Sequence, residues 1–305
     1  VSVICSDKTG TLTRNEMTVT AAAVAGGRLS VSGGGWAPHG AVLREGAELG
    51  AEADPDLAEF AACALLCNDA EIVREGEDWA PRGDPMEAAL VAFAMKAGLD
   101  PAAARAAEPR TDAIPFDAEH RFMAVLTHDH AGHGRILVKG APERVLEMCA
   151  AARGPAGGDA PLDAAAVHAE VEALAAEGLR VIALAAAPAD AEKCALAFED
   201  AARLTFLGLV GLMDPPREAA IEAVAECRAA GIRVKMITGD HARTASAVAA
   251  LLGLERPGAV LTGADLDGLS DDALRARVAE TDVFARTSPE HKLRLVRALQ
   301  AEGAV

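Results

Sequence analysis

The chain has 305 residues, is 51% hydrophobic and carries a formal net charge of −17 at pH 7. The length allows two domains as a prior, and the strongly acidic balance argues against non-specific binding to nucleic acid or to anionic membrane surfaces. The longest apolar stretch, Leu204–Met213, is shorter than the roughly 20 residues that a membrane-spanning helix needs, so we expect no transmembrane segment within the chain.

The first two thirds of the chain mix strands, helices and glycine-rich turns. An apolar run at residues 1–5 predicts a buried strand, and the glycine-rich residues 24–52 predict hairpins and loops. Helices are predicted at 56–66, 84–97, 142–149 and 163–177. Further strands are predicted at 114–116, 122–127, 135–139, 180–187 and 204–213. This mixture predicts an α+β domain over residues 19–211.

From Asp214 onward the predicted strands and helices alternate. Helices are predicted at 218–230, 244–252, 270–278 and 289–301, and strands at 233–237 and 283–285. This alternation predicts a parallel, doubly wound sheet. The strand at 1–5 belongs with it, because it ends in the same kind of polar motif. We therefore expect an α/β fold, in which a Rossmann-like parallel-sheet domain of residues 1–18 and 212–305 carries the α+β domain as a large insertion.

An acidic motif directly follows the first predicted strand. It begins with Asp7 and continues with Lys8 and Thr9. Ligands of open α/β sheets bind in the crevice outside the carboxyl ends of the strands. A carboxylate at this position can act as a nucleophile toward a phosphoryl group, and the Thr9 hydroxyl can donate a hydrogen bond to phosphoryl oxygens.

Two further motifs follow later strands and are expected at the same edge of the sheet. The first is Thr238-Gly239-Asp240, whose threonine can donate to phosphoryl oxygens, and the second ends in Lys292, which supplies positive charge to a transferring phosphoryl group. Ser288-Pro289 predicts the start of the helix that carries Lys292. Two simpler interpretations remain open, in which Asp240 only caps the next helix and Lys292 is a solvated helix lysine.

The hexapeptide Asp7-Lys8-Thr9-Gly10-Thr11-Leu12 resembles the signature of P-type ATPases, and its flanking residues resemble the type II cation pumps of the calcium-ATPase group. The resemblance extends over essentially the whole chain. It implies a haloacid-dehalogenase-like phosphorylation domain with an inserted nucleotide-binding domain. It also implies that Asp7 takes the γ-phosphoryl group of ATP. The implied catalytic set is Asp7, Lys8, Thr9, Thr238, Gly239, Asp240 and Lys292.

The resemblance also implies a magnesium site and a long-lived phosphoenzyme. Mg²⁺ is expected at Asp7 and at the backbone carbonyl of Thr9, with a further carboxylate of the family's site expected beyond Val305. Related phosphatases carry a second Asp where this chain has Thr9. Without that acid/base residue the aspartyl phosphate is expected to hydrolyse slowly.

The inserted region carries motifs that the resemblance assigns to ATP. Glu87 is expected at the adenine amino group, although Asp84 and Glu87 also fit a capping box. Phe116 is expected to stack on adenine, although a strand phenylalanine is usually a core residue. Lys139 is expected to line the adenosine pocket, with Gly140 permitting close approach of the ligand.

Four more residues complete the implied nucleotide site. Arg121 stands where the family has Lys or Arg, and Arg180 is expected to reach the phosphates. Asp214 and Arg217, in the stretch Asp214-Pro215-Pro216-Arg217, are expected near a hinge and the nucleotide phosphates. The same stretch also fits a plain turn and helix start.

The implied function is that of the catalytic part of an ATP-driven pump for Ca²⁺ or another small cation. Its abrupt ends suggest a truncated piece of a larger protein, whose transmembrane and actuator domains lie outside it. We expect this piece to be a monomer at the cytoplasmic face of a bacterial plasma membrane, with no nucleic-acid partner and little turnover alone. Two alternatives remain open: a soluble phosphatase of the same superfamily, against which Thr9 argues, and a nucleotide-binding module that is inactive in isolation.

The cysteines leave one further alternative open. Cys63 and Cys67 lie four residues apart on a predicted helix and so share one face. They fit either a metal-binding pair or, more simply, small buried hydrophobic residues in a reducing compartment.

Overall fold

The computed structural model describes residues 1–76, 78–155 and 157–305. Within this part of the chain, no helix is both long and apolar enough to cross a bilayer. The chain divides into two compact units, which are described one at a time. Unit 1 comprises Val1–Glu16, Ala175–Leu179 and Asp214–Val305, and unit 2 comprises Met17–Leu174 and Arg180–Met213.

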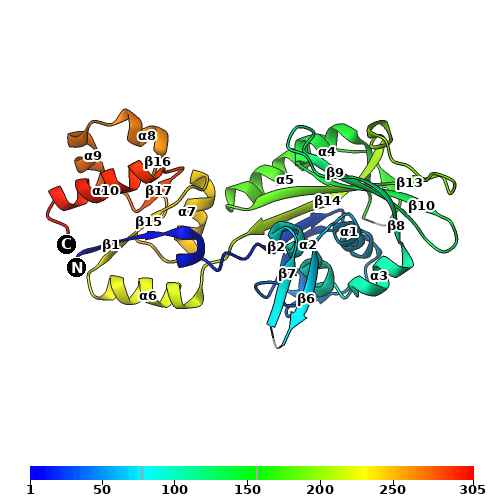
Figure 1. Ribbon diagram of the computed structural model, residues 1–305, viewed down its shortest axis with the longest axis horizontal. Helices are drawn as coiled ribbons and strands as arrows, with labels where there is room; N and C mark the ends of the chain where they lie inside the picture. The colour runs from blue at the N-terminus through cyan, green and yellow to red at the C-terminus, as the bar shows by residue number, and fades with distance from the viewer. Residues whose placement is uncertain (77, 156) are drawn as a thin grey trace. The chain divides into compact units, whose positions relative to one another are not determined.

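Unit 1 is built on a four-stranded parallel sheet. Its strand order is β1-β15-β17-β16, with bounds Val3–Asp7, Arg233–Ile237, Val283–Ala285 and Val260–Thr262. Its helices are α6 (Glu218–Ala229), α7 (Ala242–Leu251), α8 (Gly263–Gly268), α9 (Asp271–Val278) and α10 (Pro289–Ala301). Figure 1 shows α6 on one side of β1 and β15, with α9 and α10 on the other. The predicted parallel sheet is therefore present.

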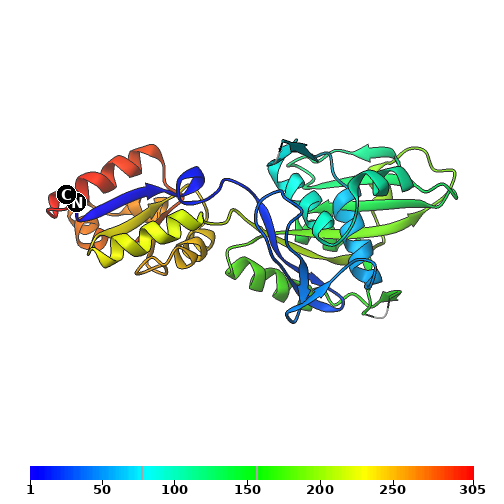
Figure 2. The same ribbon diagram turned by 90° about the horizontal axis from the view of Figure 1, so that it is seen from below.

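The core of unit 1 is small and mostly aliphatic. Phe284 on β17 and Leu295 on α10 are fully buried beside Ile237 at the end of β15. The two ends of the chain lie side by side (Figure 1 and Figure 2), and the Ser2 N–H donates to the Val305 carbonyl at 2.6 Å. The first strand covers residues 3–7 rather than the predicted 1–5, which makes Asp7 the last residue of the strand.

Unit 2 is built on an eleven-stranded sheet whose main path is antiparallel. The path runs β5-β4-β3-β2-β14-β13-β10-β9-β8, and β11 joins it in parallel beside β14. In chain order the bounds are β2 Thr18–Val24, β3 Gly27–Val31, β4 Val42–Arg44, β5 Ala47–Leu49, β8 Arg110–Ile114, β9 Phe122–His128, β10 Gly134–Gly140, β11 Cys149–Arg153, β12 Asp159–Ala160, β13 Arg180–Ala189 and β14 Leu204–Met213. A separate hairpin pairs β6 (Glu71–Glu75) with β7 (Asp78–Arg82).

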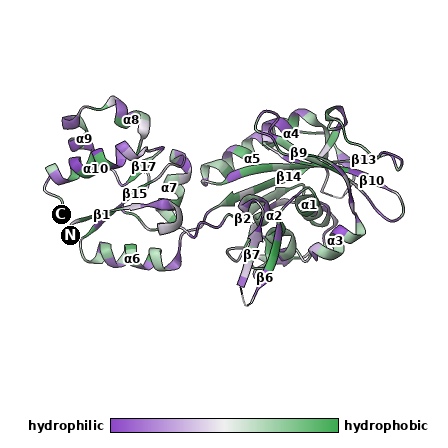
Figure 3. Cartoon of the chain, in the orientation of Figure 1, coloured by the Kyte–Doolittle hydropathy of each residue, from purple (hydrophilic) through white to green (hydrophobic). Residues whose placement is uncertain are grey.

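Two alanine-rich helices form the core of unit 2 against one face of this sheet. They are α1 (Pro55–Leu66) and α2 (Pro85–Lys96), which are largely hydrophobic in Figure 3. Phe60 and Phe93 meet edge to face at 5.8 Å between ring centroids. The remaining helices are α3 (Pro101–Ala107), α4 (Pro142–Met148) and α5 (Ala164–Ala176). Small side chains let α1 and α2 pack together, which explains how the core is filled in a chain with only 3% aromatic residues.

Most predicted elements are found, but one prediction near the site was wrong. The strand predicted at 114–116 runs over Arg110–Ile114 instead, so Phe116 lies outside it. Pro115 explains the end of the strand, because proline has no N–H to donate to a sheet. Several short elements had no strong periodicity and were not predicted, namely α3, α8, the β6–β7 hairpin, β11, β12 and β16.

Candidate functional site

The carboxyl ends of the parallel strands in unit 1 bring three predicted catalytic residues together. Asp7 ends β1 and pairs in register with Ile237, so Thr238 follows at the neighbouring strand end. Thr238 is buried, and its N–H donates to the Phe284 carbonyl at 2.8 Å. The Lys292 ammonium donates to the Asp7 carboxylate. A carboxylate, a threonine and an ammonium therefore meet at one strand edge.

The start of α10 places Lys292. The Ser288 hydroxyl accepts from the His291 N–H at 3.4 Å, and Pro289 is the first residue of the helix. The predicted cap is thus confirmed. The Lys292 side chain is 40% exposed, yet its ammonium contacts Asp7, so it is not simply a solvated helix lysine.

Lys8, by contrast, is buried between two carboxylates. Its Nζ lies 2.5 Å from the Asp240 carboxylate and 3.8 Å from that of Asp214, and the residue is only 4% exposed. Lysine is buried this deeply almost only when it is paired. His241, and not Asp240, occupies the N-cap position of α7, and its side chain makes no capping hydrogen bond, so the interpretation of Asp240 as a mere N-cap is wrong. Lys8 and Asp240 instead fix the turn after Asp7 to the turn after β15.

Asp214 and Arg217 fasten the loop that follows Asp7. The Thr13 hydroxyl donates to Asp214 at 2.6 Å, and the Arg217 guanidinium donates to the Thr13 carbonyl at 2.9 Å and the Gly10 carbonyl at 3.2 Å. Thr13 is completely buried but was not singled out from the sequence. Its signal was its place directly after the hexapeptide that begins at Asp7. Asp214 and Arg217 thus hold this loop in place through hydrogen bonds. Contact of these two residues with nucleotide phosphates stays a prediction.

The magnesium prediction rests on oxygen donors alone. Asp7 is a half-exposed carboxylate, and Thr9 is exposed in a non-helical conformation, followed by Gly10 at φ 74°. Mg²⁺ prefers oxygen ligands and usually takes one or two carboxylates together with phosphate and water oxygens, so these donors fit it. Among the described residues, no cluster of three or more His, Cys, Asp or Glu side chains is arranged to hold a metal. Phosphate and water oxygens would have to supply most of the ligands. Gly239 is exposed at the same strand edge.

In unit 2, Lys139 and Glu87 form a nearly buried ion pair. Their charged atoms lie 2.5 Å apart, and their side chains are 7% and 13% exposed. Asp84 caps α2 by accepting from the Met86 and Glu87 N–H groups. The Glu87 carboxylate turns away from this cap and accepts from Lys139 and from the Asp69 N–H. Asp84 therefore acts as the cap, while Glu87 lies with Lys139.

Gly140 is required by the protein backbone itself. A Cβ at this position would lie 2.6 Å from the Arg121 carbonyl oxygen, which any larger residue would have to displace. That carbonyl accepts from the Ala141 N–H at 3.0 Å, while Arg121 itself adopts φ 58° and pairs with Glu143 at 2.7 Å. The lack of a side chain at Gly140 thus allows, first of all, the preceding loop to approach the end of β10.

The sheet register places the remaining nucleotide candidates at one end of unit 2. Phe122, the first residue of β9, pairs with Gly140, the last residue of β10, and Gly140 pairs with Ala183. Arg180 lies three residues before Ala183 at the start of β13 and is exposed. Phe116 is 55% exposed in the loop before β9. The loop before β9, the end of β10 and the start of β13 therefore lie at the same end of the sheet. Glu87 lies at this end as well, because it is paired with Lys139.

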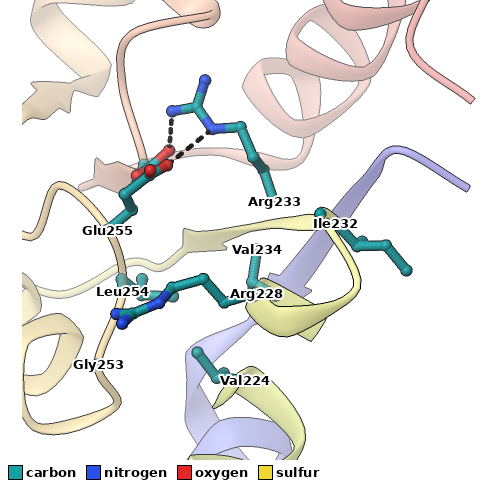
Figure 4. Close-up of a pocket in the computed structure, with 10 residues that line it drawn as sticks. Val224, Arg228, Ile232, Arg233, Val234, Gly253, Leu254 and Glu255 are labelled. Carbon is teal, nitrogen blue, oxygen red and sulfur yellow. Dashed lines mark hydrogen bonds and ion pairs between the residues drawn. The ribbon is translucent and has the colours of Figure 1, made fainter. Parts of the chain in front are cut away.

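A cavity of about 220 Å³ lies elsewhere in unit 1 (Figure 4). Its lining includes Arg233, whose Nε lies 3.6 Å from Glu255 Oε2, and Arg228, whose side chain lies beside Leu254. Arg233 begins β15, so the cavity lies at the amino end of this strand, whereas Asp7 and Thr238 lie at the carboxyl ends. It is therefore separate from the candidate catalytic residues.

Cys63 and Cys67 fit the simpler interpretation, that of small buried core residues. Their thiols lie against backbone carbonyls, with Cys63 3.6 Å from that of Ala185 and Cys67 3.5 Å from that of Met123. Both are completely buried, and burial raises the pKa of both thiols, that of Cys67 to about 11. The two residues are small, protonated core side chains.

Comparison with known proteins agrees with the resemblance seen in the motifs. The family described as "P-type ATPase, cytoplasmic domain N" matches residues 56–219. The chain is 42% identical to the cation-transporting ATPase pma1 of Synechocystis and 43% identical to the probable cation-transporting ATPase F of Mycobacterium tuberculosis. It is 37% identical to a calcium-transporting ATPase of Bacillus subtilis.

All three matches cover 100% of this chain but only 34% of the relative. The chain thus spans about a third of the length of the curated relatives it matches.

Proposed function

Since the chain belongs to the P-type ATPase family, we propose that it forms the phosphorylation and nucleotide-binding parts of an ATP-driven cation pump. Unit 1 corresponds to a haloacid-dehalogenase-like phosphorylation domain, and unit 2 to the nucleotide-binding domain. The observation that carries the proposal is the meeting of Asp7 and Lys292 at the carboxyl edge of a parallel sheet. Transport itself would need transmembrane and actuator parts outside the 305 residues.

In the proposed reaction a carboxylate oxygen of Asp7 attacks the γ-phosphorus of ATP. A new bond forms between this oxygen and phosphorus, the bond to the β–γ bridging oxygen breaks, and ADP leaves with that oxygen. Lys292 offsets the negative charge on the transferring group, and the Thr238 hydroxyl donates to it. Lys8 remains locked to Asp240, so the turn is already ordered before ATP arrives.

Magnesium would be held by Asp7 and the Thr9 carbonyl. When bound, it would neutralise charge on the phosphate oxygens. Thr9 also gives the phosphoenzyme its lifetime, because its hydroxyl cannot serve as the carboxylic acid and base that related phosphatases use. A persistent aspartyl phosphate suits a pump, since the protein must change conformation before phosphate leaves.

The nucleotide site of the proposal lies at the end of unit 2 where β9 begins and β10 ends. Phe116 offers an exposed ring for stacking on adenine, and Glu87 and Lys139 form a polar wall. Arg121 and Arg180 supply exposed positive charge for the phosphates. Relatives named calcium-transporting ATPases favour Ca²⁺ as the transported ion, within the broader class of small cations.

Acid-quenched labelling tests the proposal directly. The protein is incubated with γ-³²P-ATP and Mg²⁺, quenched in acid and treated with hydroxylamine, which cleaves acyl phosphates. We expect hydroxylamine-sensitive label that Asp7→Asn abolishes and that Asp272→Asn, on a 94% exposed aspartate of the same unit, retains. Label that persists in Asp7→Asn contradicts the assigned nucleophile. Steady phosphate release from p-nitrophenyl phosphate without acid-stable label would favour the phosphatase alternative.

A further inference from the structure

A short turn after α1 is tied to α2 by one buried amide side chain. Asn68 is 3% exposed, and its Nδ2 donates to the Ala64 carbonyl at 3.1 Å and to the Glu87 carbonyl at 2.8 Å. Its Oδ1 accepts from the Ala70 N–H at 2.8 Å. Both amide hydrogens and the amide oxygen are therefore used, which fixes the orientation of the side chain. Asn68 thus joins the end of α1, the first turn of α2 and the turn that follows α1.

The same turn holds the Glu87 carboxylate. The Asp69 N–H donates to Glu87 Oε2 at 3.0 Å, while Lys139 donates to Oε1 at 2.5 Å. From outside, Arg110 donates to the Asn68 carbonyl at 2.7 Å and to the Asp69 carboxylate at 2.6 Å. Each carboxylate oxygen is thus held by a different element, and the Asp69 N–H that holds Oε2 belongs to the turn that the Asn68 side chain bonds.

We propose that Asn68 is a positioning residue that aims Glu87 at the base of the nucleotide and so supports preference for adenine over guanine. The inference rests on the nucleotide site proposed above. A carboxylate only accepts hydrogen bonds, and its oxygens keep free lone pairs beside the Lys139 and Asp69 donors. Adenine offers an amino donor at the position where guanine offers a carbonyl acceptor. A fixed Glu87 therefore favours adenine and repels guanine, whereas a mobile Glu87 does so less.

A purely structural role for Asn68 makes a different prediction. If Asn68 only fastened α1 to α2, its loss would weaken ATP and GTP binding alike, and this loss would add to that of Glu87. If it acts through Glu87, its loss lowers the ATP-to-GTP preference and has no further effect once Glu87 is gone. A double-mutant cycle separates the two roles.

The experiment measures ATP and GTP dissociation constants by titration calorimetry for the wild type, Asn68→Ala, Glu87→Ala and the double variant. Asp54→Ala is the matched control, because Asp54 caps the opposite end of α1 by accepting from the Leu57 N–H at 2.9 Å. Arg110→Gln is a second variant, which loosens the turn from a 36% exposed position if Asn68→Ala does not fold. Thermal unfolding checks that each variant is folded.

We expect Asn68→Ala to lower the ATP-to-GTP preference by about tenfold, which is about the effect of losing one hydrogen bond to a charged group, and Arg110→Gln to lower it in the same direction. Asp54→Ala should keep the full preference. An unchanged preference in Asn68→Ala, or an equal further drop in the Glu87→Ala background, overturns the inference. A wild-type protein that binds neither nucleotide refutes the proposed function, and this inference with it, whereas a strong wild-type preference that survives in Asn68→Ala refutes the inference alone.

Discussion

The ion pair between Lys139 and Glu87 allows a quantitative test of unit 2. Both side chains are nearly buried, and removing one partner of such a pair leaves an uncompensated charge that costs about 3–5 kcal/mol. After Lys139→Met the Glu87 carboxylate keeps the Asp69 N–H, so we expect the lower end, about 3 kcal/mol. For Glu87→Gln we expect a similar loss, because the Lys139 ammonium then loses its carboxylate.

The double variant should be much less unstable than the sum of its parts. With both charges removed no buried ion is left unpaired, so we expect a total loss of about 3–4 kcal/mol and a coupling energy of about 2–3 kcal/mol. Urea unfolding of the four proteins, followed by a probe in unit 2, measures these differences. The pair Arg121–Glu143 serves as the control, because it also joins a cationic side chain to a glutamate, at 2.7 Å, but is about half exposed.

We expect the Arg121–Glu143 cycle to give less than about 1 kcal/mol, as exposed pairs do. Additive losses in the Lys139–Glu87 cycle, or a coupling no larger than that of the control, would refute the reasoning. They would mean that water reaches these charges in solution. The outcome also matters for binding studies, because an ATP affinity measured on Lys139→Met is interpretable only if the loss of stability leaves the protein folded.

Three further predictions follow from exposure and burial. Lys292→Met should slow phosphorylation of Asp7 by about 100-fold or more in rapid-quench assays, while changing the unfolding free energy by less than about 1 kcal/mol, since the pair is about half exposed. Phe116→Ala should weaken ATP binding by about tenfold in calorimetry and leave the melting temperature nearly unchanged, because the ring is 55% exposed. Burial raises the pKa of the Cys67 thiol from 9.0 to about 11 and that of Cys63 in the same direction. The free energy that the two protonated thiols add to folding is therefore complete below about pH 9 and is lost as the pH rises toward 11. Urea unfolding should show a loss of about 1 kcal/mol per thiol between pH 8 and 10, which Cys63→Ala/Cys67→Ala removes; an equal alkaline loss in that variant would contradict the assignment.

The elements that the sequence predicted well are those with strong local signals. Pro85 after Asp84 marks the start of α2, and Ser288-Pro289 marks the start of α10, because capping and proline preference act within a few residues. The alternation of strands and helices after Asp214 likewise predicted the parallel sheet. The short strands β16 and β11 were not predicted, because each forms by pairing with a strand distant in sequence and has no clear pattern of its own.

The candidate site shows the same division between local and distant information. Sequence reasoning placed Asp7, Thr238 and Lys292 at one strand edge, because parallel strands must present their carboxyl ends together. It did not identify Thr13, whose partner Asp214 is 201 residues away, nor Asn68, whose contact with Glu87 depends on how α1 packs on α2. Such pairings follow from the tertiary structure and carry no signal at fixed spacing.

The three lysines of the candidate site divide into two kinds, and this division assigns their roles. Lys8 and Lys139 are 4% and 5% exposed, and each is paired with a carboxylate at 2.5 Å. Pulling either ammonium out of such a pair to meet a phosphate would leave a carboxylate unpaired, at a cost that a new exposed contact does not offset. Lys292 is 40% exposed and can turn from Asp7 to a phosphoryl oxygen at little cost. We therefore expect Lys292 and the exposed Arg180 to contact phosphates, while Lys8 and Lys139 hold Asp240 and Glu87 in place.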